Sequence, residues 1–289
     1  MRSVSMPSGP ARPAGPLGAF LKKQRDAVRA AEHGVRHGDP DAVHDMRVAT
    51  RRLRSALRTF RPALRRWQPL RDELKWLAAA LGEVRDRDVM AARLGAELDD
   101  QPPELVIGRV RNRLRLTPGL ARARHALVGT LDSPRYGKLL AALDDLVATG
   151  PSRTLGKRAL RKAARRDLRR ADKRLDRARR SNRDGDLHDA RKAYKRARYA
   201  VEVLRPVDGR PAQRLRRRLG DLQDALGAHQ DAVVTADLLR RQAMRAYTDG
   251  ENTFTYGLLA ARQQQAAARS RTRVDRVRRA ARKPRRWLG

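Results

Sequence analysis

The sequence lacks cysteine, long apolar runs and, for its length, aromatic side chains. With no cysteine among its 289 residues, the chain forms no disulfide and offers no thiolate ligand to a metal. No apolar run approaches the roughly 18 residues of a membrane-spanning helix. The first sixteen residues contain no apolar stretch of the kind found in secretion signals. These absences favour a cytoplasmic protein and predict no membrane association.

Acidic residues are also scarce: 32 of them face 68 lysine and arginine residues, so the formal net charge is +36. All but ten of the basic residues are arginine. A GC-rich genome explains a preference for arginine over lysine, but it does not explain the excess of base over acid. Hydrophobic residues make up 40% of the chain, which is too many for a disordered polycation. The charge therefore predicts a folded protein with a polyanionic partner.

Helix-forming residues run through almost the whole chain, and β-branched residues are sparse. Four prolines predict a disordered leader over residues 1–16. Helix breaks are expected where glycine and proline interrupt the pattern, among them Gly82, Gly150-Pro151, Gly227 and residues 206–211. The segments between the breaks suit packed helical bundles, so we expect an all-α fold.

An internal repeat is the most informative feature of the sequence. Residues 44–54, HDMRVATRRLR, recur in the second half of the chain as residues 188–198, HDARKAYKRAR. Farther along, each half has a Leu-Gly pair followed by an aspartate, Asp86 or Asp231. The repeat predicts two like halves, residues 17–150 and 151–268, packed about a pseudo-two-fold axis. Residues 269–289 follow as a basic C-terminal tail.

On a helix, each copy of the repeat carries a stripe of cations opposite an apolar face. The stripe of the first copy consists of His44, Arg47, Arg51, Arg54 and Arg58, and that of the second copy of His188, Arg191, Lys195 and Arg198. A charged, solvated face is the ordinary property of any amphipathic helix. Such a face usually mixes signs, however, whereas like charges at i, i+3 and i+4 repel one another. The same costly pattern, present twice, favours a bound anion.

The two histidines fall within the first two turns of their helices, because Asp39 can cap the first helix and Asp184 or Asp186 the second. The positive end of the helix dipole and the adjacent arginines favour neutral imidazole there. We expect both histidines to donate hydrogen bonds to phosphate; the alternative is that they only pack and cap locally.

The helix before each copy carries further basic positions. The shift along the chain that relates His44 to His188 also relates Arg25 to Arg169 and Arg29 to Lys173. These four side chains are candidates for a second wall of the same anion-binding groove.

These motifs resemble those of the CHAD family, the conserved histidine α-helical domain. The resemblance rests on both copies of the repeat, on the acidic segment 81–89 (LGEVRDRDV) and on the segment 133–136 (SPRY), and it spans about residues 17–265. It implies two antiparallel four-helix bundles related by pseudo-two-fold symmetry. It also implies a basic central cavity that binds inorganic polyphosphate and directs the protein to polyphosphate granules. Two departures, Lys195 in place of arginine and Glu202 within the second stripe, predict weaker binding by the second half.

Enzymatic alternatives have weaker support. The pairs His44-Asp45 and His188-Asp189 are typical of metal-dependent HD-type phosphohydrolases. Adjacent residues on a helix point about 100° apart, so a shared metal would require the two pairs to meet across the interface. Residues 36–38 match only the beginning of the histidine acid phosphatase motif.

Four aspartates, Asp86, Asp88, Asp224 and Asp231, are read as ion-pair partners of arginines rather than as metal ligands. No Gly-rich phosphate loop and no nucleophile–base pair is recognisable. The sequence thus predicts a non-enzymatic protein without metal or cofactor.

The resulting prediction is a cytoplasmic polyphosphate-binding protein associated with polyphosphate granules, with weak non-specific nucleic-acid binding through charge alone. The alternative is a protein whose main partner is DNA or RNA. It would need aromatic stacking platforms or a duplex-reading motif, and only 4% of the residues are aromatic. The tail is either a solvated helix extension or a contact for a long polyanion. The sequence makes no prediction of oligomeric state.

Overall fold

Helices account for nearly all of the chain that the structure, a computed structural model, describes: residues 15–64, 67–115, 117–281 and 283–288. The α-helices are α1 (Pro16–Arg36), α2 (Pro40–Thr59), α3 (Trp67–Asp99), α4 (Val110–Arg113), α5 (Thr117–Asp132), α6 (Pro134–Thr149), α7 (Lys157–Ser181), α8 (Asp184–Val203), α9 (Arg205–Thr248) and α10 (Phe254–Ala280). The same ranges include the short 3-10 helices η1 (Arg61–Ala63), η2 (Pro103–Leu105) and η3 (Lys283–Leu288). No strand occurs within these ranges, so the all-α prediction is confirmed. Most of the predicted leader, residues 1–14, lies outside the described residues.

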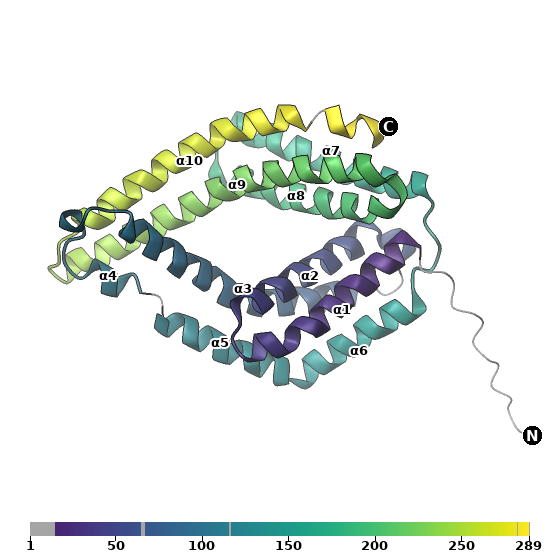
Figure 1. Cartoon of the computed structure of the whole chain (residues 1–289), viewed down its shortest axis with the longest axis horizontal. Coiled ribbons are helices and arrows are strands. Elements are labelled where there is room, and N and C mark those ends of the chain that lie inside the picture. Colours follow the sequence, from purple (N-terminus) through teal and green to yellow (C-terminus); the bar gives the residue numbers. More distant parts are fainter. Residues whose placement is uncertain (1–14, 65–66, 116, 282, 289) are drawn as a thin grey trace, which may run out of the picture.

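The chain forms two groups of helices that meet along α2 and α8. Helices α7, α8, α9 and α10 make up one group, and α1, α2, α3, α5 and α6 make up the other (Figure 1). Within each group, neighbours in sequence pack together, and α2 lies directly against α8. None of the described helices combines the length and apolarity that crossing a membrane requires.

One hydrophobic core runs through both groups. Met46, Leu53 and Leu57 of α2 are fully buried in it together with Ala190 and Ala197 of α8. A smaller cluster gathers at the far end, where α3 and α4 meet the tips of α9 and α10 (Figure 1). The two halves therefore share a core and do not behave as separate domains.

The repeat is visible in the helix bounds. Helices α2 and α8 keep the register of the repeated segment at both ends, since Pro40 corresponds to Asp184 and Thr59 to Val203. The preceding helices are one residue out of that register. The buried residues of α1, Leu17, Leu21 and Val28, correspond to the buried residues of α7, Leu160, Ala164 and Ala171. The predicted equivalence of Arg25 with Arg169 and of Arg29 with Lys173 is therefore wrong, because one more residue separates Leu160 from the start of α8 than separates Leu17 from the start of α2.

Two expected helix breaks are absent. Helix α3 runs through Gly82 and α9 runs through Gly227. The break expected at residues 206–211 is present, because Gly209 has the non-helical angles φ 44° and ψ −122° and α9 consists of two helical segments that meet there at a kink. Residues other than glycine rarely adopt this positive-φ conformation.

The helix caps agree with the prediction in one copy only. Asp39 caps α2 by accepting a hydrogen bond from the Asp41 backbone N–H, and Pro40 follows at the first helical position. The prediction that Asp184 or Asp186 caps α8 is wrong, because α8 has no side-chain cap. Asp184 instead contacts the buried His229, with 2.9 Å between Oδ1 and Nε2, and this contact draws the carboxylate away from the helix end.

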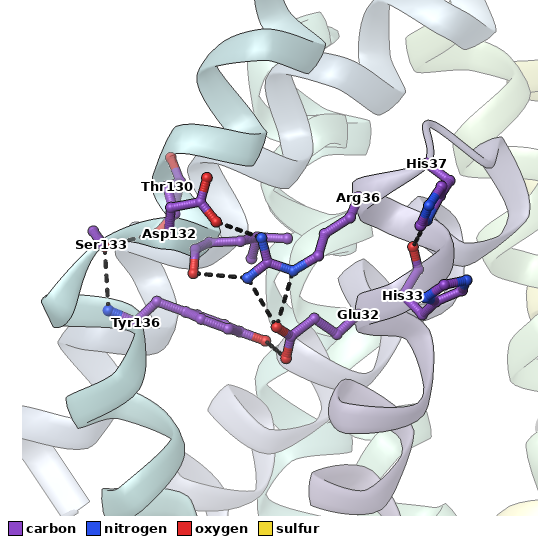
Figure 2. Close-up of polar contacts among 9 residues, drawn as sticks. Glu32, His33, Arg36, His37, Thr130, Asp132, Ser133 and Tyr136 are labelled. Carbon is purple, nitrogen blue, oxygen red and sulfur yellow. Dashed lines mark hydrogen bonds and ion pairs between the residues drawn. The ribbon is translucent and has the colours of Figure 1, made fainter.

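The segment 133–136 builds a structural corner between α1, α5 and α6 (Figure 2). Ser133 caps α6, and the buried Tyr136 donates its hydroxyl hydrogen to Glu32 Oε2 at 3.0 Å. Glu32 also accepts hydrogen bonds from Arg36, which in turn reaches Asp132. This segment therefore links α1, α5 and α6 of the first half, and none of its contacts within the described chain involves a stripe residue.

The basic segment 269–289 packs on the second half. Helix α10 continues to Ala280 without a boundary near residue 268. Arg278 pairs with Asp176 of α7 at 2.7 Å, and Arg285 pairs with Asp172 at 2.5 Å. Leu288 is buried in the main core, so most of this segment is part of the folded unit.

Glu202 joins the two central helices. Its side chain is only 10% exposed, and its Oε2 lies 3.0 Å from Nε of Arg52 on α2. Its Oε1 lies 3.6 Å from Nε of Arg198 on α8 itself. The residue that interrupts the second stripe thus neutralises two arginines at the α2–α8 contact.

We predict that Glu202→Gln lowers the free energy of unfolding by about 1–3 kcal/mol, since it leaves the half-buried Arg52 without its charged partner. Urea unfolding followed by circular dichroism measures the change. Glu83→Gln is the matched control: Glu83 is exposed and pairs with Arg87 in the same helix, so its effect stays within about 0.5 kcal/mol. Equal stability of the two variants would contradict the joining role of Glu202.

Candidate anion-binding site

The middle of the two stripes comes together where α2 packs on α8. We call Arg47, Arg51, Arg191 and Lys195 the central cluster. The pKa of Lys195 is lowered to about 7, first by burial and then by the charges of Arg51, Arg191 and Arg47 in that order. Side chains from both helices therefore act on one ammonium group. Asp231 partly opposes this effect.

The guanidinium groups of the central cluster lie over glycines of the neighbouring helices. A Cβ added to Gly82 of α3 would lie 3.7 Å from Arg47 Nη2, and one added to Gly227 of α9 would lie 3.6 Å from Arg191 Nε. Each of these arginines thus lies against the backbone of a neighbouring helix at a glycine.

Acidic partners are few around the central cluster. Arg47 Nη2 lies 2.9 Å from Asp86 Oδ1, while burial lowers the pKa of Arg47 and Arg51 adds to that effect. Asp88 pairs with Arg124 at 3.1 Å, so two of the four aspartates behave as predicted. Among the described residues, Asp224 and Asp231 make no ion pair, and no group of three or more His, Asp and Glu side chains is arranged to hold a metal.

Several stripe residues carry buried polar atoms without a hydrogen-bond partner among the described residues. These atoms are Nε of Arg47, Arg54, Arg191 and Arg198, and Nδ1 of His188. Buried polar groups are nearly always satisfied in folded proteins, so unpaired donors from both stripes at one interface point to an acceptor ligand. Guanidinium donors match the oxygens of phosphate and carboxylate.

Both histidines have a pKa below the ordinary value of 6.5, so they are neutral at pH 7, as the sequence predicts. Burial is the main cause in each. Arg85 is the next cause at His44, and Lys192 is the next at His188. A neutral imidazole still has one N–H, so each can donate a hydrogen bond to a phosphate oxygen.

The ends of the two stripes differ. Arg198 is held by the Gln223 side chain at 3.1 Å and by Glu202. On α2, burial lowers the pKa of Arg54, and the neighbouring Arg71 and Arg51 lower it further. Arg58 lies close enough to Arg196 of α8 to lower its pKa. The first stripe is therefore the more strongly cationic of the two.

The remaining predicted residues lie in two other places. Arg25 and Arg29 both pair with Asp144 of α6, so they fasten α1 to α6. Arg169 and Lys173 line a separate cavity along α7. The expected second wall from these four residues is not formed as one surface.

Sequence reasoning missed Arg52, Arg85 and Arg196. Arg52 and Arg196 occupy equivalent positions in the repeat, directly after a stripe residue, and that equivalence was the available signal. Arg85 lies on α3, outside the repeated segment, so no local pattern connected it with His44.

Comparison with known proteins agrees with this architecture. The sequence profile of the CHAD domain matches residues 19–240. Two uncharacterised proteins of Mycobacterium tuberculosis, from two strains, are each 38% identical over 285 residues; the match covers 93% of this chain but only 54% of theirs, so the chain spans about half the length of these relatives.

Two solved structures share the fold. The CHAD domain from the plant Ricinus communis has a TM-score of 0.72 at 27% identity and covers 97% of each chain. PptA from Streptomyces chartreusis has a TM-score of 0.76 at 20% identity, covering 91% of this chain and 98% of its own.

The lowered pKa of Lys195 predicts a pH-dependent stability difference. Between about pH 7 and 10.5 the unfolded chain holds this proton more strongly than the folded protein, so the stability of the wild type rises with pH in that window. Lys195→Met removes the buried charge. We expect the variant to be more stable than the wild type at about pH 6, with a difference that shrinks towards about pH 10.

Urea unfolding of both proteins across this range measures the difference. Lys192→Met is the control, because Lys192 is exposed and pairs with Asp189 in its own helix. A Lys195→Met difference that stays constant with pH would show that the lysine titrates normally.

Proposed function

Because the chain belongs to the CHAD domain family, we propose that it binds inorganic polyphosphate, without turning it over, where α2 meets α8. The observation that carries the proposal is the central cluster. Arg47, Arg51, Arg191 and Lys195 lie close together there, and the buried Nε atoms of Arg47 and Arg191 have no hydrogen-bond partner among the described residues. Association of the protein with polyphosphate granules follows from such binding and is part of the proposal.

Polyphosphate suits this site chemically. It is a flexible chain with about one negative charge per phosphate and no bases, so its recognition needs dense donors and no aromatic platform. Arginine provides planar, two-point contacts to phosphate oxygens. The neutral histidines add hydrogen-bond donors at the N-terminal ends of both stripes. A pseudo-two-fold relation between the halves, as the repeat predicts, would present equivalent donors to successive phosphates of one chain.

The central cluster also links binding to a proton. Lys195 has a pKa of about 7 because it is buried among cations. A phosphate chain beside it would favour the charged form and raise that pKa. The unliganded protein thus avoids part of the repulsion within the cluster, and the charge returns when the ligand supplies its counter-charge.

We expect polyphosphate to win a competition titration against duplex DNA and heparin, at matched charge and near-physiological salt, by tenfold or more. The variant Arg47→Ala/Arg51→Ala/Arg191→Ala should lose that preference. It should also reduce the slope of log affinity against log salt by about 2, since three phosphate contacts are lost at roughly 0.7 each.

The matched control for this variant is Lys75→Ala/Arg122→Ala/Lys138→Ala. It removes the same charge from exposed positions on α3, α5 and α6 and should retain the preference. If all three polyanions compete equally and both triple variants behave alike, binding is generic and nucleic acid becomes the leading partner. Release of phosphate in the presence of Mg²⁺, Mn²⁺ or Zn²⁺ would contradict binding without turnover.

Proton uptake provides an independent test of the site. At about pH 8, binding of polyphosphate to the wild type should take up a proton, because Lys195 becomes charged. Titration calorimetry in two buffers of different ionisation enthalpy measures this uptake. Lys195→Arg should bind with a smaller uptake, since arginine is already charged. Equal uptake in both proteins would place the binding elsewhere.

A further inference from the structure

A second cationic surface lies along the outer face of α7. It lines a cavity of about 1290 Å³, whose other walls come from Thr59 and Phe60 at the end of α2, from η1 and from Trp287 of η3. Within the described chain, ten basic residues line this cavity and no acidic residue does. Such a surface is costly for the unliganded fold, because like charges on one helix face repel one another.

Five of these cations form a continuous row, which we call the α7 track: Arg158, Lys162, Arg165, Arg169 and Lys173. Their spacing of three and four residues places them on one side of the helix, over about 22 Å of its length. No member of the track has an acidic partner among the described residues. Their neighbours Lys157 and Arg161, by contrast, are both held by the buried Asp208.

The first half has no such track. In the register that aligns the buried faces of α1 and α7, with Leu17 matched to Leu160, the counterparts of Lys162, Arg165, Arg169 and Lys173 are Ala19, Lys22, Asp26 and Ala30. Lys22 is paired with Asp26 at 2.9 Å. The row is therefore a property of the second half alone and not a consequence of the repeated architecture.

Arg196 connects the stripes with the α7 cavity, because it lies near Arg58 at the end of the first stripe and near Arg170 of α7. At one end of the α2–α8 contact Arg52 pairs with Glu202; at the other end the repeat places Arg196 and Arg58 in the same positions. There two cations face each other. Burial lowers the pKa of Arg196, followed by the effect of Arg58, while Asp167 opposes both and Arg174 and Arg170 lower the pKa further. Arg170 itself lines the α7 cavity.

We propose that a single polyphosphate chain leaves the central cluster past Arg58 and Arg196 and continues along the α7 track. This inference rests on the proposed function and specifies its ligand: the protein selects long polyphosphate over short oligophosphates, because only a long chain reaches both surfaces. The polyphosphate chain extends beyond the α2–α8 contact at this end only, because Glu202 neutralises Arg52 at the equivalent position of the other half.

The experiment compares tripolyphosphate with long-chain polyphosphate on variants of the track, of the connection and of the central cluster, with binding measured by titration calorimetry. Lys162→Ala/Arg165→Ala/Arg169→Ala removes the middle of the track, and Arg196→Gln removes the connection. We expect each to weaken long-chain binding tenfold or more while leaving tripolyphosphate binding within twofold of the wild type. Lys75→Ala/Arg122→Ala/Lys138→Ala is the charge-matched control and should leave both affinities unchanged. An unchanged melting temperature and helix content in each variant exclude unfolding as the cause.

The outcomes separate this inference from the proposed function. If the track variant binds long chains as the wild type does while Arg47→Ala/Arg51→Ala/Arg191→Ala weakens both ligands, the central site stands and the extended path is overturned. If the track variant loses long-chain binding and the central variant loses nothing, the central site is wrong and one continuous path is overturned with it. Equal losses for long-chain polyphosphate and single-stranded DNA would overturn selection for polyphosphate.

Discussion

The close packing of α2 on α8 is the constraint on which the rest of the molecule depends, because it brings two like-charged stripes together. Repulsion between arginines opposes this contact. The apolar faces of both helices, which include Met46, Leu53 and Leu57 of α2 and Ala190 and Ala197 of α8, are buried in one core and supply the favourable burial. Polar contacts add to it: Glu202 lies between Arg52 and Arg198, and Thr59 donates to the buried Asp167 at 2.5 Å. A site dense in positive charge is therefore held by neutral contacts and by acids placed beside it.

The distribution of acids decides which cations remain available. In the first half, Asp144 of α6 forms ion pairs with Arg25 and Arg29, and Asp26 forms an ion pair with Lys22. In the second half, two of the three acids of α7 pair with the C-terminal segment, Asp172 with Arg285 and Asp176 with Arg278. The third, Asp167, is buried against Thr59. The outer face of α7 consequently has no local acid. The two halves therefore differ in which cations are paired, through the placement of a few carboxylates.

Periodicity in the sequence predicted the stripes of α2 and α8 well, since the apolar and charged faces of one helix follow from its own residues. It failed where the outcome depended on contacts distant in sequence. Gly82 and Gly227 looked like helix breaks, but packing keeps both in regular helices beneath an arginine. Asp184 looked like a cap, but the buried His229 draws it away. The match of Arg25 to Arg169 failed because the second half has one more residue between the core position Leu160 and the start of α8 than the first half has between Leu17 and the start of α2. On a helix a one-residue shift rotates a side chain by about 100°.

The scarcity of aromatic side chains also bears on how the proposed site would distinguish one polyanion from another. Without stacking, selectivity between polyanions rests on the density and position of charge, and a high density destabilises the empty protein. Lys195 reduces this conflict because its pKa of about 7 leaves much of it uncharged near neutral pH. Arginine cannot do this, since its pKa stays far above neutral. The lysine that departs from the repeat thus lets the folded protein tolerate the cluster.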